Sequence, residues 1–192
     1  MANVDAMENV IHALLKPSKL WSRAEVLIRP CPVPKEPGIY GWYFKEIPPQ
    51  VPVDGCNVWK DLTLLYLGIS PSRKTSKRNL AKRIRYHFKG NAYGSTLRKT
   101  LGCLMRENLG IRLQMIGNSE KRMHFAEGEA ILSEWMEENA YVTWVIYNEP
   151  WIIEGELINR LNLPLNLLGN EEHPFHQELS KIRQQCRKQA KY

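Results

Sequence analysis

The sequence lacks several features that would place it in familiar classes of protein. It has no apolar run near the roughly 18 residues that a membrane-spanning helix needs, so no membrane segment is predicted. Residues 1–17 include acidic side chains and no basic cluster, unlike a secretory signal peptide. The four cysteines are scattered and form no CxxC pair, which argues against a structural zinc site. We therefore expect a cytoplasmic protein with reduced thiols.

Acidic residues are also missing from one long window. Between Leu62 and Arg106 there is no Asp or Glu, while Lys and Arg together number eleven, more than the net charge of +7 of the whole chain. A solvated basic face is the simplest explanation, but a density of charge without interleaved acid favours a polyanionic partner. The stretch lacks the bulky apolar face of a membrane-lying helix, so nucleic acid is the preferred partner. A second basic run closes the chain, with Lys181, Arg183, Arg187, Lys188 and Lys191.

What the sequence contains indicates one well-cored domain. Its 192 residues are 43% hydrophobic and 24% charged, near the averages for globular proteins. Strands are predicted at 38–44, 62–69 and 141–147, separated by a polar, proline-containing loop at 45–61 and by helices. The predicted helices span 3–16, 79–88, 95–107, 127–138, 150–161 and 176–188, with a hairpin between 111 and 125. This order predicts an α/β (α+β) fold in which helices pack on a small antiparallel sheet.

Two glycine-tyrosine tripeptides lie on the first two predicted strands. Gly38-Ile39-Tyr40 opens the first strand, and Tyr66-Leu67-Gly68 lies within the second. Either tripeptide alone is weak evidence of a functional motif, because tyrosine beside glycine is common in strands. Two further segments strengthen the case: Arg83 and His87 in the following helix, and Glu154-Gly155-Glu156-Leu157-Ile158 with Leu163-Pro164-Leu165-Asn166 after the third strand.

Together these segments resemble the GIY-YIG nuclease family over about residues 37 to 170. The resemblance implies a three-stranded antiparallel sheet flanked by helices and hydrolysis of DNA phosphodiester bonds. It also implies one divalent cation, Mg²⁺ or Mn²⁺, held by Glu154. By the same resemblance Tyr40 is the general base, Tyr66 orients water or phosphate, and Asn166 holds the backbone or the phosphate. The 45–61 loop is longer than the family's usual hairpin and reads as an insertion.

The residues themselves suit this chemistry. Arg83 and His87 stand four apart and share a helix face, where Arg83 can donate two hydrogen bonds to phosphate and His87 can orient a tyrosine hydroxyl or relay a proton. One essential carboxylate suits Mg²⁺, which takes its other ligands from water and phosphate. Free tyrosine has a pKa of about 10, so Tyr40 needs a metal and Arg83 nearby to form phenolate. Taken singly, Glu154 could merely begin a helix, and the tyrosines could be packing residues.

The predicted contacts with DNA come from basic residues around the Arg83 helix: Lys77, Arg78, Lys82, Arg85 and Lys89. Three segments are expected: 1–36 as an N-terminal helix and lead-in, 37–170 as the nuclease-like domain, and 171–192 as a basic C-terminal helix. Two alternatives stand beside the nuclease, namely an inactive nucleic-acid-binding module with the same fold and a domain that binds an acidic protein. The biological role and the formation of a homodimer are left open by the sequence.

Overall fold

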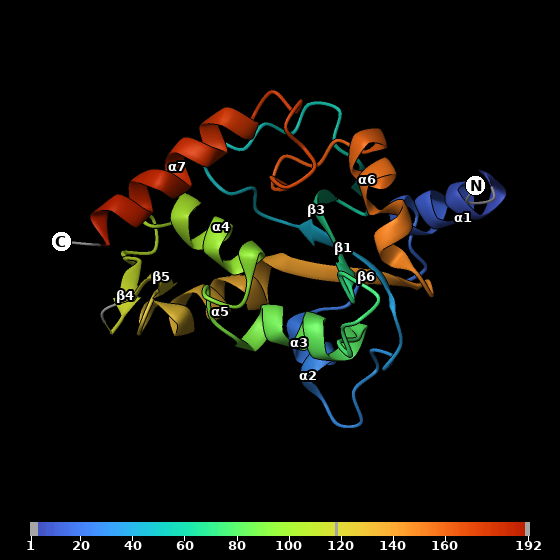
Figure 1. The fold of residues 1–192 in the computed structure, drawn as a ribbon, viewed down its shortest axis with the longest axis horizontal. Helices are drawn as coiled ribbons and strands as arrows, with labels where there is room; N and C mark the ends of the chain where they lie inside the picture. The colour runs from blue at the N-terminus through green and yellow to red at the C-terminus, as the bar shows by residue number, and fades with distance from the viewer. Residues whose placement is uncertain (1–3, 118, 191–192) are drawn as a thin grey trace.

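The computed structural model describes residues 4–117 and 119–190. In it, helices surround a central sheet (Figure 1). The predicted helices and strands are found within a few residues of their expected bounds, together with a short additional helix, α2. In chain order the elements are α1 (Val4–Leu15), α2 (Arg23–Leu27), β1 (Gly38–Phe44), β2 (Val58–Trp59), β3 (Leu62–Ser70), α3 (Leu80–Lys89), α4 (Thr96–Leu104), β4 (Gln114–Ile116), β5 (Ser119–His124), α5 (Gly128–Asn139), β6 (Ala140–Ile146), α6 (Pro150–Arg160) and α7 (His176–Gln189).

The main sheet is antiparallel and has the strand order β2-β3-β1-β6. The predicted strands are β1, β3 and β6, and the α/β fold class is confirmed. The sheet has a fourth strand that the sequence analysis did not predict, because β2 is only two residues long and lies inside the loop at 45–61. Every residue of β1 is buried, as expected of a central strand covered on both faces. The expected hairpin near Gly117 is the separate pair β4-β5.

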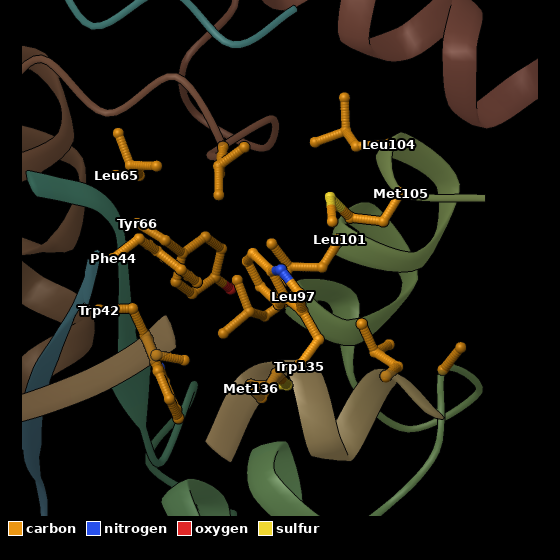
Figure 2. Close-up of a cluster of buried hydrophobic side chains, with 14 of the residues drawn as sticks. Trp42, Phe44, Leu65, Tyr66, Leu97, Leu101, Leu104, Met105, Trp135 and Met136 are labelled. Carbon is orange, nitrogen blue, oxygen red and sulfur yellow. The ribbon is translucent and has the colours of Figure 1, made fainter. Parts of the chain in front are cut away.

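A β-bulge in β3 affects how its side chains are presented. Trp42 pairs with Tyr66, whereas the next residue of β1, Tyr43, pairs with Leu64, so Leu65 is the extra residue. Because a bulge interrupts strict alternation, Leu65 and Tyr66 both join the same buried cluster (Figure 2). The tyrosine of the second tripeptide is thereby directed to one particular face of the sheet.

The two faces of the sheet carry different hydrophobic cores. One core joins Ile39 and Tyr43 to α1 and α6, and the other joins Tyr40 and Trp42 to α3, α4, α5 and α7. Figure 1 shows α1 and α6 to one side of the sheet and α4, α5 and α7 to the other. Successive residues of β1 therefore point into opposite layers. Tyr40 points into the layer that contains α3.

The helices of this layer follow the sequence pattern closely. Leu80, Ile84 and Phe88 recur every four residues along α3, as a core-facing helix requires, and are fully buried. Ser95 caps α4, with its Oγ accepting from the Arg98 backbone N–H at 3.1 Å. Helix α7 packs on α4 through Leu179, Ile182 and Cys186, all in the same core. The division into the three segments 1–36, 37–170 and 171–192 stays a prediction.

Candidate active site

Four elements bring the predicted site residues together: β1 carries Tyr40, β3 carries Tyr66, α3 carries Arg83 and His87, and α6 carries Glu154. Tyr40 pairs with Gly68 across the strands, and a side chain at Gly68 would place its Cβ 2.5 Å from the Tyr40 Oη. The glycine of the second tripeptide therefore has a steric reason, since only glycine lets the Tyr40 ring lie across β3.

A continuous hydrogen-bond network holds the Tyr40 hydroxyl. Its Oη lies 2.9 Å from the His87 Nε2 and accepts from the Arg83 Nε at 3.3 Å. On the far side of the imidazole, the His87 Nδ1 lies 2.7 Å from the Ser95 Oγ. Arg83 is anchored in turn by donating from Nη1 to the Gly94 carbonyl at 2.8 Å. The predicted juxtaposition of Arg83, His87 and Tyr40 thus exists as direct contacts.

The histidine of this network is neutral. Burial, followed by the positive charges of Arg83 and Arg98, holds the pKa of His87 well below its usual value of about 6.5. Its side chain is completely enclosed. A neutral imidazole has one donor and one acceptor nitrogen, so His87 couples Tyr40 to Ser95 without adding charge.

Both tyrosines are shifted toward the neutral form by their surroundings. Burial raises the pKa of Tyr40, while the charges of Arg83 and Arg78 oppose that shift and do not overcome it. Burial likewise raises the pKa of Tyr66. The two arginines alone therefore do not make Tyr40 a phenolate at neutral pH. Additional positive charge is needed beside it for the role of base.

Glu154 supplies the carboxylate of the site. It is partly buried, and burial raises its pKa, while its charge is near enough to raise the pKa of both Tyr40 and Tyr66. In residues 4–117 and 119–190, the side-chain carboxylate of Glu154 has no hydrogen bond or ion pair, whereas the neighbouring Glu156 is exposed. A partly buried carboxylate without a partner is costly and suits a cation ligand.

A single-carboxylate site fits a hard divalent cation. Within the described part of the chain no group of three or more His, Cys, Asp or Glu side chains is placed to hold a metal ion. Mg²⁺ needs only one or two carboxylates, with water and phosphate completing its octahedron. Glu154 meets this lesser requirement.

Asn166 is used entirely by the backbone of β3. Its Nδ2 donates to the Leu67 carbonyl and its Oδ1 accepts from the Leu67 N–H, both at 2.9 Å, and the side chain is buried. The side-chain amide therefore pairs with the backbone of Leu67 as a neighbouring strand would, next to Tyr66. Of the two roles expected for Asn166, these bonds match support of the backbone.

The predicted DNA-contacting residues fall into two groups. Arg78 and Lys82 line a hollow of about 260 Å³ together with Arg83. Lys77 is exposed in the loop before α3. Along another side of α3, Lys82, Arg85 and Lys89 border a second hollow of about 470 Å³. There the Arg85 guanidinium donates to the Val26 carbonyl of α2 at 3.1 Å.

Three residues of the site were not identified as functional from the sequence. Ser95 was interpreted only as a helix cap, although it also contacts His87. Arg98 was counted in the basic window, but it is fully buried and paired with Glu129 at 2.7 Å. Arg183 of α7 donates to the Thr100 hydroxyl at 3.3 Å. Burial is the largest effect on both groups: it raises the pKa of Tyr66 and lowers the pKa of Arg183. The positive charge of Arg183 lowers the pKa of Tyr66 by a smaller amount.

A local signal existed for only one of these residues. Ser95 begins a predicted helix shortly after His87, so its closeness could have been suspected. Nothing near Arg183 in the sequence indicates that α7 returns to Tyr66. No helix in the described ranges is long and apolar enough to cross a bilayer.

Comparison with known proteins identifies the family of the domain that contains these residues. The profile of the GIY-YIG catalytic domain family matches residues 38–185, which include both tripeptides, Arg83, His87, Glu154 and Asn166. No curated protein and no solved structure matches the chain.

Proposed function

Because this chain belongs to the GIY-YIG catalytic domain family, we propose that it is a divalent-cation-dependent endonuclease that hydrolyses DNA phosphodiester bonds. The observation that supports this proposal most directly is that a hydrogen-bonded tyrosine and a partly buried carboxylate occur in one site. Tyr40 is held between Arg83 and His87, and the carboxylate of Glu154, which has no partner among the described residues, influences the ionisation of Tyr40. A binding module would gain nothing from enclosing that carboxylate.

In the proposed reaction Tyr40 acts as a phenolate and removes a proton from the attacking water. The water oxygen bonds to phosphorus, the bond from phosphorus to the leaving oxygen breaks, and that oxygen takes up a proton. When bound at Glu154, Mg²⁺ or Mn²⁺ would offset negative charge on the phosphate and favour the phenolate. The rise in the pKa of Tyr40 in the metal-free protein is the reason that this charge is required.

The surrounding hydrogen bonds are able to support that phenolate. If the Ser95 hydroxyl donates to the His87 Nδ1, it can still accept from the Arg98 N–H, and the His87 Nε2 then carries a proton toward Tyr40. Arg83 donates to the same phenolic oxygen from Nε. Two donors aimed at one oxygen favour its charged form. The neutral state of His87 is consistent with this tautomer.

Phosphate would be held by the cations around the site. Arg83 uses Nε and Nη1 within the described residues, which leaves Nη2 for a phosphate oxygen. Arg183 lies on the Tyr66 side and Arg78 on the Tyr40 side. Cations on both sides would allow DNA to pass over the two tyrosines.

The decisive experiment compares Glu154→Gln with Glu156→Gln, a matched change on the exposed side of the same helix. With supercoiled plasmid and Mg²⁺ or Mn²⁺, the wild type and Glu156→Gln are expected to cleave alike, and Glu154→Gln at least about 100-fold more slowly, which is about 2.7 kcal/mol of transition-state stabilisation. Cleavage by Glu154→Gln at the wild-type rate would refute the proposal. DNA binding by a wild type that never cleaves would favour the inactive module.

Metal binding can be measured without catalysis. Since burial raises the pKa of Glu154, the folded protein holds this proton more tightly than the unfolded chain, and stability from this group falls as pH rises through that window. A cation that binds the ionised carboxylate offsets the loss. We therefore expect Mn²⁺ to raise the thermal midpoint more at pH 8 than at pH 5. The effect is expected to vanish in Glu154→Gln and persist in Glu156→Gln.

The number of strands cut bears on assembly. Each chain carries one copy of the proposed site, so nicked circles are the expected first product from plasmid. Linear product formed without a nicked intermediate would indicate two sites acting together, as in a homodimer.

A further inference from the structure

A hollow of about 260 Å³ adjoins the proposed active site and shares Arg83 and Arg78 with the proposed phosphate contacts, but its aromatic surface is not used in the chemistry above. Its walls are cationic and aromatic, and its lining residues are Arg78, Lys82, Arg83, Tyr86, Tyr93 and Gly94. It lies over α3 and the turn between α3 and α4. This mixture of charge and ring surface is unlike an ordinary solvated face.

The aromatic residues of this hollow are unusual in being exposed. Across the described parts of the chain, the large apolar side chains that are exposed include two aromatics, Tyr86 at 37% and Tyr93 at 52%. Both line the same hollow. Aromatic rings gain much from burial, so two rings left open at one place indicate a surface that a ligand covers.

One of the two rings is held firmly in place. A side chain at Gly90 would put its Cβ 2.5 Å from the Tyr86 ring, and one at Gly94 would also collide with it. The Tyr86 hydroxyl donates to the Asn91 Oδ1 at 3.1 Å. Tyr86 is therefore laid against the backbone of the 90–94 turn, ready to offer a flat surface at little cost in side-chain entropy.

Arg83 links this hollow to the active site. Its Nη1 holds the Gly94 carbonyl in the wall, while its Nε reaches the Tyr40 hydroxyl. Arg78 also lines the hollow, and its charge lowers the pKa of Tyr40 against the larger effect of burial. A phosphate bound at Arg83 would therefore have its neighbouring nucleoside beside the hollow.

We propose that this hollow holds an unpaired nucleobase of the DNA, stacked on Tyr93 and Tyr86, with its flanking phosphates on Arg78 and Lys82. The proposal rests on the proposed nuclease function and names its substrate class. Bases in a duplex are stacked inward and cannot reach an aromatic surface unless they leave the helix. The preferred substrate is therefore DNA with an unpaired nucleotide beside the cleaved bond, as in a single strand or a branch point.

Tyr93 gives the cleanest test, because it is the more exposed ring and its replacement leaves the core intact. Binding is measured in the Glu154→Gln background with a 2-aminopurine-labelled single strand and with a duplex of the same sequence. Tyr93→Leu is expected to weaken single-strand binding about 10-fold, or about 1.4 kcal/mol, and to quench 2-aminopurine less. Duplex binding should stay within about 2-fold. Tyr93→Phe should resemble the parent, as should Leu168→Ala, a change at a residue that is 87% exposed and does not line the hollow.

Failure of this inference is distinguishable from failure of the proposed function. If Tyr93→Leu weakens the binding of single-stranded and duplex DNA equally, or weakens neither, the nucleobase site is refuted. That holds even if the wild type cleaves DNA. If Tyr93→Leu selectively weakens the single strand but the wild type never cleaves, the nucleobase site is supported and the nuclease proposal falls.

Discussion

Replacing Asn166 with aspartate changes one donor in the segment that supports β3 beside Tyr66. In the wild type the amide gives one hydrogen bond to the Leu67 carbonyl and receives one from the Leu67 N–H, each at 2.9 Å and shielded from water. An ionised carboxylate can still accept from the N–H but cannot donate to the carbonyl. The Asn166→Asp protein then buries a charge and leaves a carbonyl without its donor.

The magnitude follows from those bonds. A lost buried hydrogen bond costs about 1 kcal/mol, and a buried group left without a partner costs about 1–3 kcal/mol, so we expect a loss of about 2–4 kcal/mol at pH 7.5. A protonated carboxyl has the same shape as the amide and can donate, so the loss should shrink near pH 4. The sign follows because the folded state favours the neutral acid. Relative stability falls as pH rises above the unfolded pKa of about 3.9 and levels off past the raised folded pKa.

Urea denaturation at pH 4.5 and pH 7.5 measures this difference, with Asn159→Asp on the exposed face of α6 as the matched control. The control should lose less than about 0.5 kcal/mol at either pH. A loss in Asn166→Asp that is the same at both pH values, or no larger than that of the control, would refute the reasoning. Asn166 would then not be holding β3 through its donor.

Two further predictions test the network around Tyr40. Ser95→Ala removes the partner of the His87 Nδ1, so the His87 Nε2 proton is less firmly directed at the Tyr40 phenolate. We expect kcat/KM for cleavage at pH 7 to fall about 10-fold, and the increase of kcat/KM with pH to occur at higher pH. Ser95→Thr, which keeps the hydroxyl, should restore both. Glu129→Ala leaves the fully buried Arg98 without its carboxylate and should cost about 3–5 kcal/mol in urea denaturation. A double change with Arg98→Met should recover part of that loss, and no recovery would contradict the role of the unpaired charge.

Several features of the protein could be predicted from the sequence because they depend on short-range physics. The stripe of Leu80, Ile84 and Phe88 follows from the helical period, and the same period places Arg83 and His87 on one face. The apolar run at 62–69 likewise predicts a strand from neighbouring residues alone. The family resemblance selected Tyr40 and Glu154 for one site, and the structure brings them near each other.

Other features depend on contacts between distant parts of the chain. Composition marks a basic window but does not tell its members apart. Arg98 is buried and paired with Glu129, whereas the charge of Arg78 acts on Tyr40. The difference depends on which helix face packs against α5. A two-residue strand such as β2 has too few residues for a pattern and forms only where β3 offers an edge.

By itself, then, the sequence determined the helices other than α2, the long strands and the set of residues proposed to carry the chemistry, since hydrophobic period and motif are properties of neighbouring residues. Only the tertiary structure decided their surroundings. The bulge at Leu65 directs Tyr66, and α7 returns to bring Arg183 to it. Burial also raises the pKa of Tyr40, which makes a phenolate there depend on added positive charge. Burial is a sum over many distant contacts, so no single segment of the sequence specifies it.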